Sequence, residues 1–379
     1  MLANSLGIYV HIPFCRAKCS YCAFVSAVCD RSLQQSYVAA LCGEITAAGG
    51  DFSVPVDTVF FGGGTPTVLE TTELSAILQG LRAAFPVAAN AEISLEANPG
   101  TVDRNSLQIL RQAGFNRLSL GVQSFDDTVL AGIGRIHRAE DAEKAISDAR
   151  AAGFENISLD LMYGLPLQSV SGWKITLDRA VALGPDHISA YGLKLEEGTP
   201  LEAAVTSGQV ALPSEEDEES MYDFLNVFLP SQGYARYEIS NYATPGRECR
   251  HNLKYWNYEI YRGFGVAAHS FDGVDRFANT DDLSTYVKSL TGGMSCEGFR
   301  ETLDLPTAMA EYVFLSLRTS RGLSGTNFSR RFGREFVEYY EEPIARLVRL
   351  GLLMQETDSW RLTERGMKLG NQAFAEFLP

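Results

Sequence analysis

Three cysteines near the N-terminus have a spacing that suits a metal centre. Cys15, Cys19 and Cys22 form a C-x3-C-x2-C pattern, so their thiolates can converge on one inorganic cluster. Soft sulfur ligands suit iron–sulfur clusters and zinc alike, but structural zinc sites usually add a second, distant cysteine pair, which this sequence lacks. A 4Fe-4S cluster is favoured. The alternatives are zinc, with Cys29 or His11 as fourth ligand, and three unrelated cysteines.

Three thiolates leave one iron of a 4Fe-4S cube open, because such a cube usually takes four. The amino and carboxylate groups of S-adenosylmethionine (SAM) can chelate that iron and bring the sulfonium beside the cluster. One electron then breaks a carbon–sulfur bond and gives a 5′-deoxyadenosyl radical, while the protein positions and shields the cofactor. We therefore expect a radical SAM centre at these cysteines.

The other cysteines and the composition narrow the class of protein. Cys29, Cys42, Cys249 and Cys296 are scattered, which indicates packed thiols in a reducing compartment rather than a disulfide framework. A formal net charge of -15 opposes nucleic-acid binding, which depends on Lys and Arg neutralising phosphates. No stretch approaches a membrane span, and the N-terminus has no basic and apolar leader. We expect a cytoplasmic protein with no membrane segment and no nucleic-acid partner.

The elements that must position the cysteines alternate between β-rich runs and helix-like stretches. The predicted strands are residues 8–12, 58–61, 92–96, 117–122, 157–161 and 187–191. Residues 33–48, 71–85, 103–113, 139–152 and 172–183 lie between them and carry apolar side chains at helical spacing. Six strand–helix repeats predict an α/β fold with helices packed outside a parallel sheet.

Polar and glycine-bearing residues follow each predicted strand. The cysteine loop follows the first, residues 62–66 the second, and residues 98–100 the third. Because the carboxyl ends of parallel strands meet at one rim, we expect a single composite site that collects all six loops.

The last part of the chain differs from the first in its sequence pattern. Residues 213–232 predict a helix with acidic residues in its first turns, and residues 234–279 are rich in glycine and aromatic side chains. From about residue 305 helices dominate, and an apolar helix, a hairpin and a final helix predict a winged-helix-like module. We predict a barrel over residues 1–235, a connecting region over 236–300 and a C-terminal domain over 301–379.

Ordered motifs along nearly the whole chain resemble the oxygen-independent coproporphyrinogen III oxidase family of radical SAM proteins. The matching segments are residues 9–15 with Cys19 and Cys22, then 62–67, 96–100, 121–125, Arg135, 160–166, and His251-Asn252 with Tyr255-Trp256. The resemblance implies an incomplete (β/α)6 radical SAM barrel with a smaller, mainly helical C-terminal domain.

The resemblance also implies cofactor-binding roles residue by residue. Tyr9 and Tyr21 flank the cluster and SAM; Gly63, Gly64 and Thr65 approach the methionine moiety; Glu96, Gln123, Arg135 and Asp160 hydrogen-bond SAM. Glycine suits a strand end where backbone comes close to a ligand. For any one of the four polar side chains, surface polarity or helix capping is the alternative.

Two departures divide the family. The oxidases carry a further cysteine two positions after the third ligand, where this chain has Phe24, and they have a long N-terminal arm that this chain lacks. Both features match the haem-chaperone branch, the HemW-like proteins. That branch implies haem binding, delivery of haem to acceptor proteins and an electron donor, with the oligomeric state left open.

The motif from His251 to Trp256 suits a haem site, because imidazole is a common axial ligand and Tyr255 and Trp256 offer flat apolar faces. The alternative is a packing motif with His251 hydrogen-bonded internally, and His269 is a rival ligand. We expect a haem chaperone. Its competitors are a porphyrinogen decarboxylase, against which Phe24 argues, and a radical SAM enzyme for another substrate.

Overall fold

The computed structural model describes residues 5–28, 30–50 and 54–379, and six parallel strands lie at its centre. They are β1 (Leu6–Ile12), β2 (Val56–Gly63), β3 (Val87–Ala97), β4 (Arg117–Gln123), β5 (Ile157–Tyr163) and β6 (His187–Gly192). They neighbour one another in chain order, and each coincides with one of the six predicted runs. The predicted parallel α/β sheet is confirmed.

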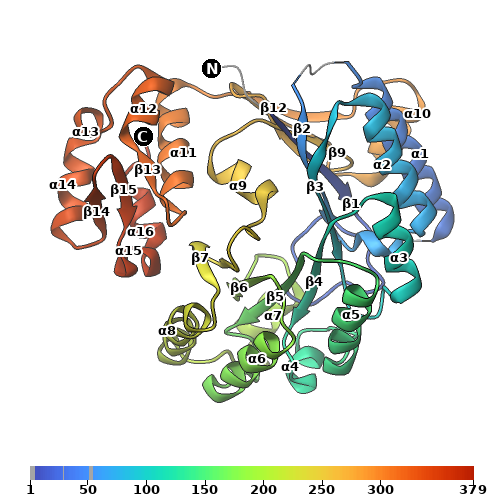
Figure 1. The fold of residues 1–379 in the computed structure, drawn as a ribbon, viewed down its shortest axis with the longest axis horizontal. Helices are drawn as coiled ribbons and strands as arrows, with labels where there is room; N and C mark the ends of the chain where they lie inside the picture. The colour runs from blue at the N-terminus through green and yellow to red at the C-terminus, as the bar shows by residue number, and fades with distance from the viewer. Residues whose placement is uncertain (1–4, 29, 51–53) are drawn as a thin grey trace.

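Helices cover the outer face of these strands (Figure 1). The crossover helices are α1 (Arg31–Ala47), α2 (Thr71–Ala84), α3 (Arg104–Ala113), α4 (Asp127–Gly132), α5 (Ala139–Ala151) and α6 (Val170–Ala182). Side-chain caps fix several starts: Asp30 accepts from the Leu33 amide at 2.9 Å, and Ser169 from the Gly172 amide at 3.1 Å.

The central strands alternate between an apolar outer face and a polar inner face. In β3, Ile93 and Leu95 are 3% and 0% exposed and belong to the core beneath the helices. Successive strand side chains point to opposite faces, so Ser94 and Glu96 point inward. The barrel interior is therefore lined by polar groups.

Further strands extend the sheet at both edges. Beside β6 lie β8 (Asn241–Ala243) and β7 (Ala235–Glu238). Beside β1 lie β9 (Tyr261–Phe264), β10 (His269–Phe271), β11 (Asp275–Asn279) and β12 (Glu297–Thr302). Within the described residues β7 and β12 remain the two outer strands, so the barrel is incomplete. Helices α7 (Pro200–Thr206), α8 (Glu215–Ser231), α9 (Arg250–Trp256) and α10 (Leu283–Thr291) accompany these edges.

The C-terminal part forms a small helical domain with a three-stranded sheet, set apart from the barrel in Figure 1. Its elements are α11 (Leu305–Leu317), β13 (Leu323–Ser324), α12 (Gly325–Phe332), α13 (Phe336–Tyr339), α14 (Glu341–Arg349), β14 (Leu353–Glu356), β15 (Ser359–Leu362), α15 (Glu364–Lys368) and α16 (Gly370–Ala375). The expected helix, hairpin and helix are α14, β14–β15 and α15. The second hydrophobic core also includes Tyr258 and Phe271 of the connecting region, and the domain boundaries stay predictions.

Among the helices of the described ranges, none combines the length and hydropathy that a bilayer-spanning segment needs.

Candidate functional site

The cysteine loop leaves β1 and returns against the same strand end. The Cys15 amide donates to the Ala27 carbonyl at 3.1 Å, and the Ala27 amide donates to Pro13 at 2.8 Å. Within this closed loop Cys15, Cys19 and Cys22 are half-buried free thiols. The loop therefore presents three sulfur atoms on one short, tied segment.

Two donors reach these sulfurs, one from the end of β2 and one from the segment between α4 and α5. Thr65 Oγ1 lies 3.6 Å from Cys15 Sγ, and Arg135 Nη1 lies 3.5 Å from Cys19 Sγ. Hydrogen bonds to cluster sulfurs are one of the means by which a protein tunes an iron–sulfur centre.

A cavity of about 480 Å³ opens between this loop and the inner face of the strands. Every residue that the resemblance associates with the cluster and SAM lines it, with the exception of Tyr9: Cys15, Cys19, Tyr21, Cys22, Gly63, Gly64, Thr65, Glu96, Gln123, Arg135 and Asp160. Tyr9 stacks on Phe60 at 6.3 Å and contacts His11 Nδ1 at 3.1 Å. The single composite site expected at the strand ends is therefore present as a cavity, with Tyr9 one layer behind its wall.

Backbone geometry at two strand ends is unusual. Gly63 has φ +108°, and a Cβ there would lie 2.5 Å from the His11 ring, so only glycine fits. Gln123 has φ +66°, a conformation that costs a non-glycine residue energy and recurs at functional sites. His11 itself is buried, with Nε2 2.9 Å from the Val25 carbonyl oxygen, which matches a satisfied core histidine.

Glu96 and Asp160 face the cavity as a pair of carboxyl groups. Burial, followed by the charge of Asp160, raises the pKa of Glu96 to about 8. Burial also raises the pKa of Asp160, although the Ser119 hydroxyl donates to it at 3.1 Å. At neutral pH Glu96 is therefore largely protonated and can donate a hydrogen bond as well as accept one.

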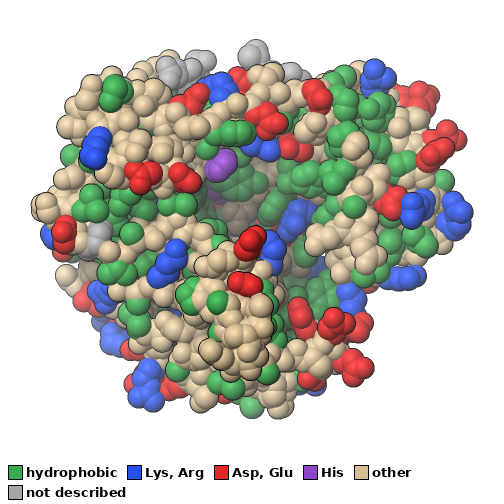
Figure 2. Space-filling view, turned by 180° about the vertical axis from the view of Figure 1, so that it is seen from behind, with side chains coloured by type: hydrophobic (Ala, Val, Ile, Leu, Met, Phe, Trp, Pro, Cys, Tyr) green, Lys and Arg blue, Asp and Glu red, His purple; other side chains and the backbone are tan. Residues whose placement is uncertain are grey.

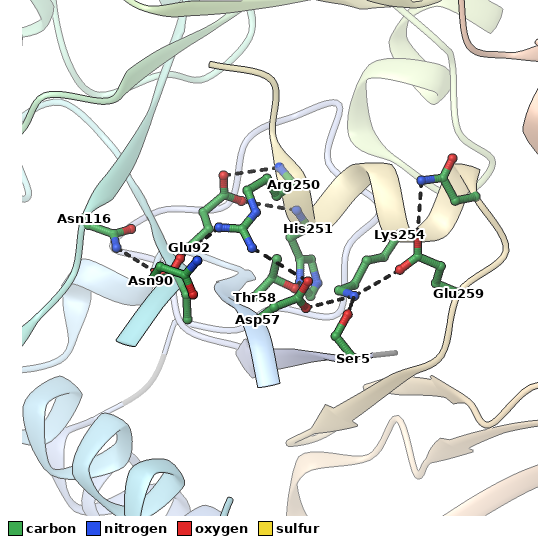
Figure 3. A network of polar contacts seen from close by, with 12 residues as sticks. Ser5, Asp57, Thr58, Asn90, Glu92, Asn116, Arg250, His251, Lys254 and Glu259 are labelled. Atoms are coloured by element: carbon green, nitrogen blue, oxygen red, sulfur yellow. Dashed lines mark hydrogen bonds and ion pairs between the residues drawn. The ribbon is translucent and has the colours of Figure 1, made fainter. Parts of the chain in front are cut away.

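Helix α9 carries the motif from His251 to Trp256 and lies between the strands and the C-terminal domain (Figure 1). Glu92 accepts from the Arg250 and His251 amides at 3.2 Å each, which ties the start of the helix to β3. Lys254 Nζ lies 2.8 Å from Asp57 and 3.1 Å from Glu259 (Figure 3). This charged network anchors α9 near the amino-terminal end of β2 and the middle of β3.

Within this anchor His251 is 1% exposed and both ring nitrogens are engaged. Nδ1 lies 2.9 Å from Thr58 Oγ1 and Nε2 lies 2.8 Å from the Tyr255 hydroxyl. Burial lowers the pKa of His251 to about 3. The Trp256 ring lies beneath the Arg318 guanidinium, 4.5 Å away, toward the C-terminal domain. This geometry favours the packing interpretation of His251 and Trp256.

A second hollow of about 370 Å³ adjoins the cysteine loop. Its lining is rich in aromatic rings: Tyr9, His11, Ala23, Phe24, Val25, Tyr255, Tyr261, Ala267 and His269. We call it the aromatic groove. Of the five histidines only His269 is exposed, and Figure 2 shows a histidine in a hollow bordered by hydrophobic side chains. Burial, and then the charge of Arg276, lowers the pKa of His269, so a neutral imidazole faces this groove.

Comparison with known proteins identifies the family. Residues 9–180 match the radical SAM superfamily, and residues 303–369 match the HemN C-terminal domain. The "Heme chaperone HemW" of Bacillus subtilis (strain 168) is 36% identical over 376 residues, covering 98% of each chain. Its namesake from Escherichia coli (strain K12) is 34% identical over 388 residues, again covering 98% of each. The chain belongs to the HemW family.

The fold of this HemW family member also matches a solved enzyme. The structure described as "Coproporphyrinogen III oxidase (HemN) from Escherichia coli is a Radical SAM enzyme" aligns with a TM-score of 0.86 at 27% identity, over 99% of this chain and 90% of that one. The expected incomplete radical SAM barrel with its helical C-terminal domain is confirmed, as is the resemblance that led to it.

Several cavity residues of this HemW family member escaped the sequence reasoning. Arg117, Ser119 and Ser189 line the cavity without having been singled out in the sequence. A two-residue period would have connected some of them, since Ser119 follows Arg117 by two positions and lies on the same face of the strand. Arg117 looked like the polar start of a strand and gave no signal of its own.

Proposed function

We propose that this protein holds a 4Fe-4S cluster and SAM in the large cavity, binds haem in the aromatic groove, and delivers haem to acceptor proteins. The observation that carries the haem part is the groove itself, which places the exposed imidazole of His269 among aromatic rings beside the cysteine loop. The names of the relatives, "Heme chaperone HemW", support the same role.

The chemistry of the donor set fits a cluster on Cys15, Cys19 and Cys22. All three are free thiols on the cavity wall; Cys15 is contacted by the Thr65 hydroxyl and Cys19 by the Arg135 guanidinium. When bound, such a cluster with SAM supplies one-electron cleavage of a carbon–sulfur bond. Arg135 contributes by holding the loop, since it also donates to Asn98 Oδ1 at 2.7 Å.

The rest of the cavity wall fits SAM. Gly63 and Gly64 present backbone without a side chain, and Glu96 and Asp160 offer carboxyl groups for the amine and hydroxyls of such a ligand. Gln123 presents its amide from a strained strand end. Hydrogen bonds made inside such a cavity are stronger than in bulk water, because the local dielectric constant is lower.

The groove fits haem because a porphyrin needs flat apolar contacts and an axial nitrogen. Tyr255 and Tyr261 pack edge to face, with centroids 4.7 Å apart, and Phe24 is 68% exposed at the opposite border. A neutral imidazole is the form that binds iron, and burial keeps His269 in that form. We therefore assign the axial ligand to His269 rather than His251, with Tyr255 as a ring contact and Trp256 outside the site.

The test is anaerobic haem titration of the purified protein against single variants. His269→Ala should weaken haem binding about tenfold or more, or shift the Soret band, because it removes the axial nitrogen. His251→Ala is the matched control: it should lower the melting temperature while leaving the Soret position unchanged. An unchanged Soret band in His269→Ala, with loss of haem in a still-folded His251→Ala, would return the ligand role to His251.

The competing function is oxidative decarboxylation of a porphyrinogen, which the match to the Escherichia coli oxidase structure favours. Phe24 argues against it, because this position carries no thiol. Anaerobic turnover with coproporphyrinogen III, SAM and an electron donor distinguishes the two. We expect no decarboxylated product, and robust product would replace the chaperone role with the enzyme.

A further inference from the structure

We propose that the surface outside the cysteine loop is the docking site for an acidic protein that carries one electron to the cluster. We call this surface the outer face; it is formed by Arg16, Lys18, Ile136 and Leu167. This assignment rests on the cluster proposed at the three cysteines, because without a cluster there is nothing to reduce.

The cysteine loop can be approached from two sides at Cys19. Cys19 lines the large cavity, and it also lines a small hollow of about 20 Å³ whose other walls include Arg16, Gly134 and Ile136. All three of these residues are exposed. A single cysteine residue therefore borders both the cavity proposed for SAM and a hollow at the surface.

The segment between α4 and α5 connects this surface to the cysteine loop by direct contacts. The Ser20 amide donates to the Ile133 carbonyl at 3.2 Å. Arg135 Nη1 lies 3.5 Å from Cys19 Sγ, while the next residue in the chain, Ile136, is exposed. An electron delivered at the outer face would therefore cross a short, packed path to the cysteine sulfur.

Two large apolar side chains are exposed on the outer face. Ile136 is 65% exposed and Leu167 is 69% exposed. A Cβ on Gly132 would lie 3.4 Å from Leu167 Cδ1, so Leu167 stands against the end of α4, the helix that leads to Ile136. Helices α4 and α6, which flank this region, lie side by side in Figure 1. Exposed apolar side chains that lie together within polar surroundings are typical of protein–protein contact surfaces.

The backbone of Leu167 indicates that its exposure has a function. Leu167 has φ +64°, a left-handed conformation that is unfavourable for a residue with a bulky side chain. Glycine adopts this conformation without strain. The chain therefore carries a large apolar side chain on its surface at a strained position, and such positions concentrate at functional sites.

The positive charge of the cysteine loop indicates an acidic partner. Arg16 and Lys18 are exposed, and residues 15–22 contain no acidic side chain. Arg16 Nη1 donates to the Gly100 carbonyl at 2.7 Å, which orients the guanidinium without neutralising its charge. In a chain of net charge -15, a local group of cations directs an acidic protein to one place, while the rest of the surface repels it.

The carboxylates of the neighbouring segments are held by other groups. Asp103 and Asp126 each cap the start of a helix, at 2.8 Å from a backbone amide. Asp127 forms an ion pair with Arg138 at 3.0 Å. A helix dipole or a cation offsets each of these three negative charges, so positive charge prevails on the outer face.

The chemistry at the outer face is the transfer of a single electron. The reduced carrier loses one electron and the oxidised cluster gains it, while no atom moves between the two proteins and no bond forms. A protein with a bound flavin or with its own iron–sulfur centre can supply such an electron. The residues of the outer face act by bringing the two centres close together.

The experiment is a calorimetric titration of the anaerobically reconstituted, SAM-loaded protein with oxidised flavodoxin and, separately, with an oxidised plant-type ferredoxin. Both probes are acidic one-electron carriers, and the oxidised forms report docking without turnover. We expect at least one of them to bind, with an affinity that falls as the ionic strength rises.

Three variants test the outer face. Ile136→Asp should weaken binding about fivefold or more, because it removes an apolar contact and adds a negative charge. Arg16→Glu should weaken binding about threefold at low ionic strength and reduce its salt dependence. Leu167→Gly should weaken binding about threefold while the melting temperature stays equal or rises, because glycine relieves the strain. A lower melting temperature with unchanged binding would instead assign Leu167 to packing.

Val227→Asp is the matched control. Val227 is 72% exposed, like Ile136, but lies on α8, outside the outer face, so this variant should bind the carrier as the wild type does. Binding of neither carrier, or equal binding by the wild type, Ile136→Asp and Leu167→Gly, would overturn the docking site.

Iron analysis of the same samples separates this result from the cluster proposal. Wild-type protein with almost no iron would refute the cluster itself. Full iron content without carrier binding would refute the docking site alone. The haem titration and its His269 variant are independent of both results.

Discussion

The network of Glu92, His251, Lys254 and Asp57, which we call the α9 anchor, and the large cavity both contain buried charged residues. The two regions differ in whether these residues have partners. Around α9, Lys254, Glu92 and His251 each have partners from other elements. In the cavity, the carboxyl groups of Glu96 and Asp160 line open space. The contrast teaches that charged groups paired between elements have a packing role, and that charged groups lining a cavity mark a place for a ligand.

The largest effect should come from the cysteines on the cavity wall. Cys15→Ala, Cys19→Ala or Cys22→Ala should reduce iron from about four atoms per chain to near zero, because each thiolate ligates one iron. Iron and sulfide analysis with visible absorbance checks this. Cys42→Ser is the control, since Cys42 lies on α1, outside the cavity, and should keep its iron. Full iron content in any of the three alanine variants would remove the cluster assignment.

The next largest effect is expected on the free energy of unfolding when the α9 anchor is disrupted. Lys254 is 3% exposed, and Lys254→Met would leave Glu259 without its cation and Asp57 with Arg250 alone, 3.7 Å away, lowering the free energy of unfolding by about 3 kcal/mol. Lys144→Met is the matched control, because its pair with Asp148 is 68% exposed at the lysine and should cost at most about 0.5 kcal/mol. Equal losses in chemical denaturation would erase the distinction between the two networks.

A smaller effect is expected on SAM affinity. Glu96→Ala should raise the Kd for SAM about tenfold, which corresponds to about 1.4 kcal/mol, by removing one hydrogen-bonding carboxyl group. Iron content should stay at the wild-type level, which separates loss of SAM from loss of the cluster. Unchanged affinity measured by equilibrium dialysis would mean that the carboxyl pair serves something else.

The smallest effect concerns pH. The folded pKa of Glu96 is about 8 against an ordinary value of 4.5, so the folded state holds an extra proton between these values. Stability should therefore fall as pH rises through this window. Glu96→Gln removes the titrating group, so the wild type should lose about 1 kcal/mol relative to Glu96→Gln between pH 6 and pH 7. Parallel denaturation curves at the two pH values would show that Glu96 is not held neutral.

Local patterns in the sequence were sufficient for the six central strands and their helices, because each strand is a long apolar run and each helix has a clear period. The edge strands β7 to β11 were not predicted. They have three to five residues each, and neighbours distant in the chain stabilise them. A run of three to five residues is too short to show the alternation of apolar and polar residues that identifies a strand.

The cavity set was predictable because the motifs lie at strand ends, whose convergence follows from parallel topology. The position of His251 was not. Whether a histidine faces a ligand or a partner depends on contacts between β2 and α9, which are 193 residues apart at Thr58 and His251. Arg117 escaped for the same reason, since only the assembled barrel brings it to the cavity wall.

The pairing of β1 with β9 has a consequence for biosynthesis. One edge of β1 pairs with β2, but Gly7 to Val10 meet Tyr261 to Phe264 on the other edge. The strand that leads into the cysteine loop therefore keeps an open hydrogen-bonding edge until more than 260 residues have left the ribosome. Such late, non-local closure slows folding and leaves an edge that can pair wrongly in the meantime. Both edges of the strand that precedes the cysteine loop are therefore paired only after two-thirds of the chain has been synthesised.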